Sequence, residues 1–228
     1  MRLYLPLATL VLLFSQVLHG QDIAARPGLE IPTMSFSDSA RIDSVPHAAA
    51  HRLLPGKMSF MERGLWGENG ILRTVGIASP LTPEVRKSEL SLRRTMLTAH
   101  QIGGFVTLGL MATTVYYGQR ALDNFNSPEF RTLRNNHSSF VTATIFSYTA
   151  TGLLAILSPP PLLRRDEVST TTIHKTLAWV HFVGMVVTPI IGSSIRHSMS
   201  ELQLARYHQV CGYVTTVALA ASLIIVTF

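Results

Sequence analysis

Four long segments of the chain contain no Asp, Glu, Lys or Arg: residues 96–117, 138–158, 176–195 and 207–228. Each is close to the roughly 20 residues that an α-helix needs to cross a hydrocarbon core of about 30 Å. A soluble helix would show a polar stripe about every 3.6 residues, whereas these segments are interrupted mainly by Thr, Ser and Gly. The sequence therefore predicts an all-α membrane protein with a four-helix transmembrane up-down bundle over residues 96–228.

The N-terminus has the pattern of an export signal. Arg2 is followed by an apolar run from Leu3 to Leu18 and by Gly20, a small residue that suits signal peptidase cleavage. We expect residues 1–20 to be a cleaved signal peptide, and the alternative is an uncleaved anchor that adds a fifth helix. Under either interpretation we expect an integral membrane protein, most consistently of a bacterial inner membrane, with residues 21–95 on the periplasmic side.

The exported segment, residues 21–95, is predicted to be mostly irregular. Most of it is rich in Pro, Gly and Ser, which favour turns. Near its end, Thr82 suits a helix N-cap, Pro83 the first helical position and Glu84 the first turn. We expect a short interfacial helix near residues 82–94 that leads into the first membrane helix.

Two further stretches indicate how the loops are built. The apolar residues within 58–73, with Trp66 among them, suit either a surface lid packed on the outer helix ends or a docking surface for a partner. The prolines in "SPPPLLRRDE" predict the end of the second helix, because proline cannot continue a helix.

Each predicted membrane helix begins with a histidine, and these four residues are separated by 37, 37 and 34 positions: His100, His137, His174 and His208. In an up-down bundle this order places His100 and His174 near the outer face, and His137 and His208 near the inner face. Two pairs of imidazoles, one pair in each leaflet, are what two bis-histidine haems require. One histidine at a membrane boundary is more often an interfacial polar residue, but four in register are unusual, because ionisable residues in membrane helices are rare and usually face the bundle interior.

A porphyrin also needs space beside its ligand. Three of the histidines are followed four positions later, on the same helix face, by a small residue: Gly104, Ala178 and Gly212. Val141, which follows His137, is the exception, so that histidine is the weakest of the four by this criterion. No internal repeat beyond the histidine of each helix is evident.

Basic residues lie near both ends of the predicted helices, which weakly opposes the positive-inside rule. Haem propionates would be neutralised by such residues: Arg94, Arg165 and Lys175 on the outer side, and Arg134 on the inner side. Anionic lipid headgroups are an equally suitable partner for these charges.

His181 competes with His174 as a ligand. The two residues share a helix face but lie about 10 Å apart along the axis, so they cannot both bind one iron in the same geometry. The spacing from the other helices favours His174, whereas Gly184, which follows His181 closely, keeps the alternative open. If it is not a ligand, His181 points into the space between the two haems.

The histidine-bearing segments resemble the cytochrome b561 family, in particular the membrane part of proteins that join it to an extracellular DOMON domain. "HQIGGFVTLGLMATTVYYGQR" and "HSSFVTATIFSYTATGLLAIL" are similar to its first and second ligand-bearing helices, and "HKTLAWVHFVGMVVTP" and "YHQVCGYVTTVALA" to its third and fourth. The resemblance covers about residues 96–228. It implies two b-type haems, one held by His100 and His174 and the other by His137 and His208. Two departures are the absence of a further flanking helix and of a DOMON-sized domain before the core.

We therefore expect a di-haem b-type electron-transfer protein that passes electrons between the two membrane faces, and if it is an enzyme, a membrane oxidoreductase. A haem-free membrane subunit or assembly factor of a larger complex is the alternative, and a metal transporter is a weaker one, because the helices contain no carboxylate. Cys211 is the single cysteine and offers no disulfide. The basic pI of about 9.9 is assigned to the membrane flanks and not to nucleic acid. The sequence names no redox partner and leaves a homodimer open.

Overall fold

The computed structural model describes residues 53–162, 170–195 and 201–227, which belong to one structural unit, His51–Phe228. The predicted signal peptide, residues 1–20, and Arg165 lie outside this part of the chain. Within it every regular element is a helix, so the all-α prediction is confirmed there. The helices are α2 (Phe60–Trp66), α3 (Ile71–Thr74), α4 (Pro83–Asp123), α5 (Phe130–Ile156), α6 (Thr170–Ser194) and α7 (Glu201–Thr227).

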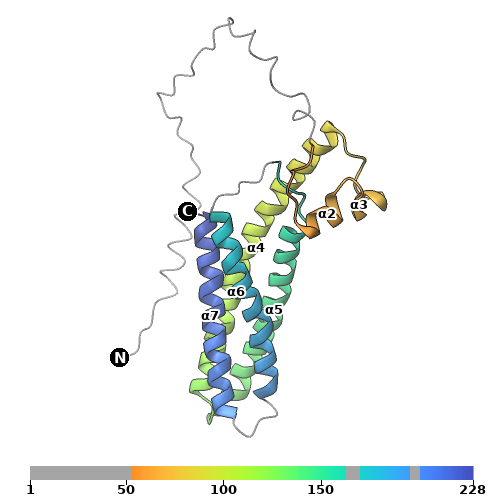
Figure 1. Ribbon diagram of the computed structural model, residues 1–228. Coiled ribbons are helices and arrows are strands. Elements are labelled where there is room, and N and C mark those ends of the chain that lie inside the picture. The colour runs from red at the N-terminus through yellow and green to blue at the C-terminus, as the bar shows by residue number, and fades with distance from the viewer. Residues whose placement is uncertain (1–52, 163–169, 196–200, 228) are drawn as a thin grey trace, which may run out of the picture. The chain divides into compact units, whose positions relative to one another are not determined.

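The four long helices α4 to α7 run up and down in a bundle (Figure 1). α4 packs against α5 and α7, and α6 packs against α7, whereas α5 and α6 have at most a few close backbone contacts. The order around the bundle is thus α5, α4, α7, α6. This order leaves α4 diagonal to α6 and α5 diagonal to α7, with a looser seam between α5 and α6.

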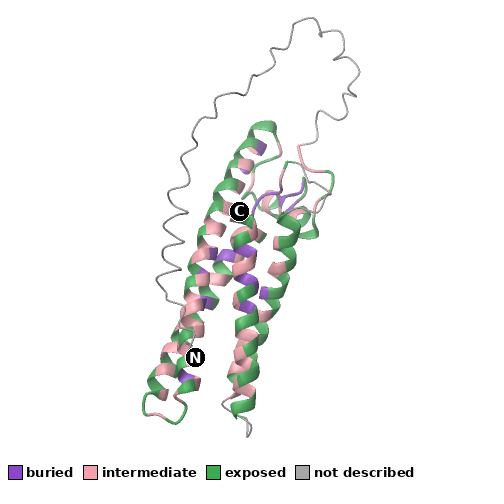
Figure 2. Ribbon diagram, turned by 90° about the vertical axis from the view of Figure 1, so that its left-hand side faces the viewer, coloured by how far each residue is buried: buried purple, intermediate pink, exposed green. Residues whose placement is uncertain are grey.

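Among the described residues, three helices are long and apolar enough to cross a membrane: α5, α6 and α7. Figure 2 shows that most of the length of the long helices is exposed or half-buried. Large apolar side chains such as Phe146, Trp179 and Val217 are among the exposed ones. A helix that faces water carries polar residues on that side. These helices are therefore those of an integral membrane protein. α4 is long enough to span but falls short in apolar character, so the span over residues 96–117 stays a prediction.

The helix predicted near residues 82–94 is present, and it runs without a break into the next segment as the single helix α4. Its start is as predicted, because Thr82 caps it by accepting a hydrogen bond from the Val85 amide at 3.3 Å, and Pro83 opens the first turn. No glycine or proline follows until Gly103, so nothing stops the helix at the membrane boundary. Its 41 residues span about 60 Å, twice a hydrocarbon core.

The histidines also lie deeper in their helices than expected. α5 begins at Phe130 and α7 at Glu201, seven residues before His137 and His208 respectively. Polar first turns, with Arg131, Arg134 and Glu201, therefore precede the charge-free segments as part of the same helices.

Residues 53–80, which we call the lid, carry α2 and α3 and stand beside the upper ends of α4 and α5 (Figure 1). Trp66 is 6% exposed, and its indole Nε1 donates a hydrogen bond of 3.0 Å to the carbonyl of Leu157. Leu157 caps α5, which ends just before the predicted proline stop at residues 159–161. The structure thus packs Trp66 of this segment on the end of α5, whereas Phe60, Met61 and Ile71 are exposed.

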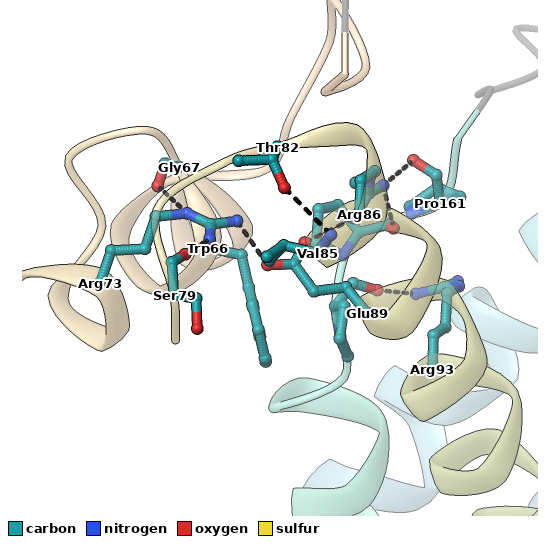
Figure 3. A network of polar contacts seen from close by, with 12 residues as sticks. Trp66, Gly67, Arg73, Ser79, Thr82, Val85, Arg86, Glu89, Arg93 and Pro161 are labelled. Atoms are coloured by element: carbon teal, nitrogen blue, oxygen red, sulfur yellow. Dashed lines mark hydrogen bonds and ion pairs between the residues drawn. The ribbon is translucent and has the colours of Figure 1, made fainter. Parts of the chain in front are cut away.

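A buried ionic cluster fixes the lid to α4 (Figure 3). The Glu89 carboxylate lies 2.5 Å from the guanidinium of Arg73 in the lid and 3.1 Å from that of Arg86. Arg86 also donates to the carbonyls of Pro160 and Pro161, at 2.7 and 3.1 Å. Two cations share one carboxylate here, and the peptide carbonyls after α5 stabilise the excess positive charge.

The first prediction concerns Glu89. Glu89→Gln leaves two buried guanidinium groups without a counterion, and losing one partner of a buried ion pair costs about 3–5 kcal/mol. We expect the thermal midpoint to fall and trypsin to cleave the lid after Arg63 much faster. Glu84→Gln is the matched control, because Glu84 is an exposed carboxylate one turn earlier in α4. Equal cleavage of both variants would show that the ionic cluster does not hold the lid.

Candidate functional site

The same polar register recurs in all four long helices, which sequence reasoning missed. A histidine is followed seven positions later by Thr or His and fourteen positions later by Thr or Ser. The sets are His100, Thr107 and Thr114 in α4; His137, Thr144 and Thr151 in α5; His174, His181 and Thr188 in α6; and His208, Thr215 and Ser222 in α7. Positions seven apart share a helix face. The middle members are all buried, so this face points into the bundle.

In α4 and α5, the first residue of each set, the histidine, contacts the third residue of the set on the other helix. His100 Nδ1 lies 2.8 Å from the backbone carbonyl oxygen of Thr151, and His137 Nδ1 lies 2.9 Å from that of Thr114. In both cases the acceptor is the third member of the register on the partner helix. Because the helices are antiparallel, the two contacts are reciprocal and lie at opposite ends of the pair.

α6 and α7 repeat this arrangement. His174 Nδ1 lies 3.1 Å from the carbonyl oxygen of Ser222 and 2.8 Å from its hydroxyl, and His208 Nδ1 lies 2.9 Å from the carbonyl oxygen of Thr188. Again the acceptors are the third members of the partner's register. The bundle is thus built from two helical hairpins with the same internal hydrogen bonding.

These contacts assign the ring protons of the histidines. A peptide carbonyl can only accept, so the Nδ1 atoms of His100, His137 and His208 carry the hydrogen and their Nε2 atoms keep the lone pair. Histidines that bind metals usually donate their other ring N–H to such a carbonyl, which fixes the tautomer and the ring orientation. These three histidines therefore have the tautomer of an Nε2 ligand, and His174 has both a carbonyl and the Ser222 hydroxyl, which can donate or accept, beside its Nδ1.

The rings meet in pairs across the diagonals of the bundle. The ring centres of His100 and His174 are 6.2 Å apart with planes at 89°, and those of His137 and His208 are 5.9 Å apart with planes at 84°. Two imidazoles on opposite sides of one metal ion, each with a bond of about 2 Å, place their centres about 6 Å apart. The structure thus brings together the two pairs that the sequence predicts, one at the lid end of the bundle and one at the far end.

A cavity of about 660 Å³ surrounds the far-end pair. It lies among all four long helices and is lined mainly by apolar side chains, with His137, His208 and Arg134 among its walls. Pockets of about 300–1,000 Å³ accept ligands and cofactors. Space is therefore present where a flat group between these two histidines would need it.

Two glycines let the far-end histidines reach their acceptors. A Cβ on Gly118 would lie 2.9 Å from His137 Cε1, and one on Gly192 would lie 2.8 Å from His208 Cε1. Each glycine stands four positions after the carbonyl that its histidine contacts, Thr114 or Thr188. The absence of a side chain there allows the imidazole to lie against the helix backbone.

The small residues singled out from the sequence have different surroundings. Gly104 is buried against Leu223, because a Cβ there would lie 2.7 Å from Leu223 Cδ2, so in this structure it serves the packing of α4 on α7. Gly212 does line the cavity, and so does Val141, the exception to the sequence pattern. The size of the residue four positions after each histidine therefore did not predict where the cavity lies.

His181 belongs to neither pair. It is buried, and its Nδ1 lies 2.9 Å from the hydroxyl oxygen of Tyr148. This contact joins α6 to α5 across the seam where these helices are farther apart. The structure places His174, and not His181, opposite His100.

The predicted propionate partners are spread more widely. Arg94 and Lys175 are exposed on α4 and α6, and Arg165 lies outside the described residues. Arg134 lines the far-end cavity close to its histidine pair. Of these four, Arg134 is the basic side chain that the structure brings to a histidine site.

Within the described ranges no group of three or more His, Cys, Asp or Glu side chains is placed to hold a metal ion. The candidate site offers two ligands at each end of the bundle. Compared with protein-family models, curated proteins and solved structures, the chain shows no significant match. What the site can do therefore rests on the geometry of its own residues.

A second prediction tests the role of Gly118. Gly118→Ala places a methyl group within contact of the His137 ring, which must shift away from the Thr114 carbonyl at a cost of about 1–3 kcal/mol. In a ¹⁵N-histidine spectrum of the protein, we expect the hydrogen-bonded Nδ1–H signal of His137 to shift or disappear.

Gly109→Ala is the matched control on the same helix, because a Cβ there meets nothing within 4 Å. We expect its histidine signals to match the wild type. An unchanged His137 signal in Gly118→Ala would contradict the close packing described here.

Proposed function

We propose that the chain is a transmembrane electron carrier of cytochrome b561 type with two b-type haems. His100 and His174 would hold the iron of one haem, and His137 and His208 that of the other. One observation carries this proposal: two facing pairs of imidazoles, each about 6 Å apart between ring centres, have all four Nδ1 atoms within hydrogen-bond distance of carbonyls and the Nε2 atoms of His100, His137 and His208 left for a metal.

The number of ligands supports haem over a free metal ion. A structural zinc site uses about four protein ligands and a catalytic one about three. Each site here has a pair of histidines, and the described residues contain no larger group. A pair is sufficient for haem iron, because the porphyrin supplies the other four ligands. The metal-transporter alternative has no comparable support.

The chemistry of the far-end site fits a haem. The cavity is largely apolar, as the porphyrin face requires, and Arg134 offers a cation for a propionate. At the lid end, the support is the facing imidazoles and the tautomer of His100. When bound, a six-coordinate haem supplies a one-electron couple and no open iron position for oxygen.

The protein residues have three tasks in this proposal. The carbonyls of Thr114, Thr151, Thr188 and Ser222 orient the imidazoles and keep them neutral at Nε2. The apolar walls of the far-end cavity would keep water away from a haem there, in both its reduced and its oxidised form. The register separates the two histidine layers by about fourteen residues of helix, or about 20 Å along the axis.

Electron passage between the membrane faces follows from this placement. We propose that α4 crosses the bilayer with α5, α6 and α7, and that the lid end is the outer, periplasmic end, in agreement with the predicted export signal. One histidine pair would then lie in each leaflet. Small groups or proteins at the two faces would donate and accept the electrons.

A third prediction tests the ligands. The purified protein should show a reducible b-type spectrum with two haems per chain. His100→Ala or His174→Ala should remove one of them, and His137→Ala or His208→Ala the other, because each variant leaves a single imidazole in its pair. A reduced-minus-oxidised spectrum and a haem assay per chain give the result.

His181→Thr is the matched control, since the other three helices carry Thr at this position of the register. We expect it to retain both haems. A colourless wild-type preparation from haem-replete cells would sink the proposal and favour a haem-free membrane subunit or assembly factor.

A further inference from the structure

The lid exposes a set of large apolar side chains that no part of the described chain covers. Phe60 is 88% exposed and Ile77 75% exposed, and three others are exposed by about half or more: Met61, Ile71 and Val75. Neighbouring exposed residues include Arg63 and Lys57. These exposed apolar residues all lie between residues 57 and 77 of the chain, on and around α2 and α3.

The orientation of α2 shows that the exposure is systematic. Trp66 faces inward, because it is buried and bonded to Leu157. At about 100° per residue, Phe60 and Met61 lie on the side of the helix away from Trp66. A helix on a water-facing surface would carry polar residues on that side, and α2 carries Phe, Met and Gly64.

The lid is fixed at a level where a membrane helix ends. Its contacts are with Leu157 at the end of α5 and with Glu89 in α4. The exposed apolar side chains of α5 continue up to this point, through Leu153, Ile156 and Leu157. Because α5 is apolar and long enough to span, its end marks the boundary of the hydrocarbon.

The lid also stands on the lipid side of the bundle. Figure 1 shows α2 and α3 beside the upper ends of α4 and α5, away from α6 and α7. They therefore do not close the bundle like a cap. The hydrogen bond from Trp66 to Leu157 places α2, with its exposed Phe60 and Met61, at the level where α5 ends.

We infer that the outward face of the lid, formed by Phe60, Met61, Ile71, Val75 and Ile77, is inserted in the lipid interface beside α5. Short amphipathic elements bind there by burying apolar side chains at the boundary of headgroups and acyl chains, and nearby Arg and Lys side chains favour anionic headgroups. The ionic cluster of Arg73, Glu89 and Arg86 then holds the lid rigidly at this depth. The inference does not depend on haem.

A spin-label experiment tests the depth of the lid in the full-length protein. In a Cys211→Ala background, which removes the single cysteine, a nitroxide is attached to Phe60→Cys or Ile77→Cys in nanodiscs that contain anionic lipid. Relaxation by oxygen, which concentrates in lipid, is compared with relaxation by a water-soluble nickel chelate. We expect oxygen to dominate at both positions.

Glu68→Cys is the matched control, because Glu68 is exposed in the polar turn between α2 and α3. We expect the nickel chelate to dominate there and the oxygen-to-nickel ratio to be severalfold lower. Dominance of the nickel chelate at positions 60 and 77 would overturn the inference and indicate a face that awaits a protein partner. Strong broadening between labels on two copies would also overturn it, in favour of a dimer contact. Both label sites are exposed, and the thermal midpoint of each variant verifies its fold.

Discussion

The hydrogen bond between an imidazole Nδ1 and a backbone carbonyl of the neighbouring helix is the interaction on which the bundle depends. It occurs four times, twice in the α4–α5 hairpin and twice in the α6–α7 hairpin. A carbonyl within a helix already accepts a bond from the amide four residues later, so its second lone pair is the one available to the imidazole. Where that later residue is Gly118 or Gly192, the ring can approach without a clash. Each contact satisfies a polar group inside an apolar bundle and fixes the direction of Nε2.

The buried polar groups of the protein lie in two environments, and they are stabilised by different kinds of contact in each. In the middle of the bundle the groups are neutral hydroxyls, and Thr107 and Thr144 each bond both to a carbonyl on their own helix and to a hydroxyl on the neighbouring one. Such short, neutral contacts suit helix packing in lipid, where an unpaired polar group is costly. At the lid end the groups are charged, and Arg86 and Glu89 are buried under the proline-rich turn after α5. Among the described residues, the buried Arg and Glu side chains lie at this end, where peptide carbonyls and water are near.

Much of the fold was predictable because its signals are local. The charge-free segments indicate the long helices, Thr82 and Pro83 locate the start of α4, and the prolines after α5 locate its end. The pairing of His100 with His174 and of His137 with His208 followed from the alternating direction of the helices, and the structure brings both pairs together. Other features depend on contacts between helices and were missed. Gly104 packs on Leu223, which is distant in sequence, and the acceptor carbonyls of the histidines belong to neighbouring helices. The heptad register was nevertheless readable in the sequence, since its members are Thr or Ser at fixed distances from each histidine.

His181 stands where the other three long helices have Thr, and it contributes the contact between α6 and α5 on the loosely packed side of the bundle. Three helices place Thr in the middle layer: α4, α5 and α7. α6 carries His181 at this level and faces α5, to which it is not closely packed. A threonine side chain is too short to reach across such a seam. The longer side chains of His181 and Tyr148 meet there, with 2.9 Å between the imidazole Nδ1 and the tyrosine hydroxyl oxygen. Two long polar side chains thus replace the short ones where the helices diverge.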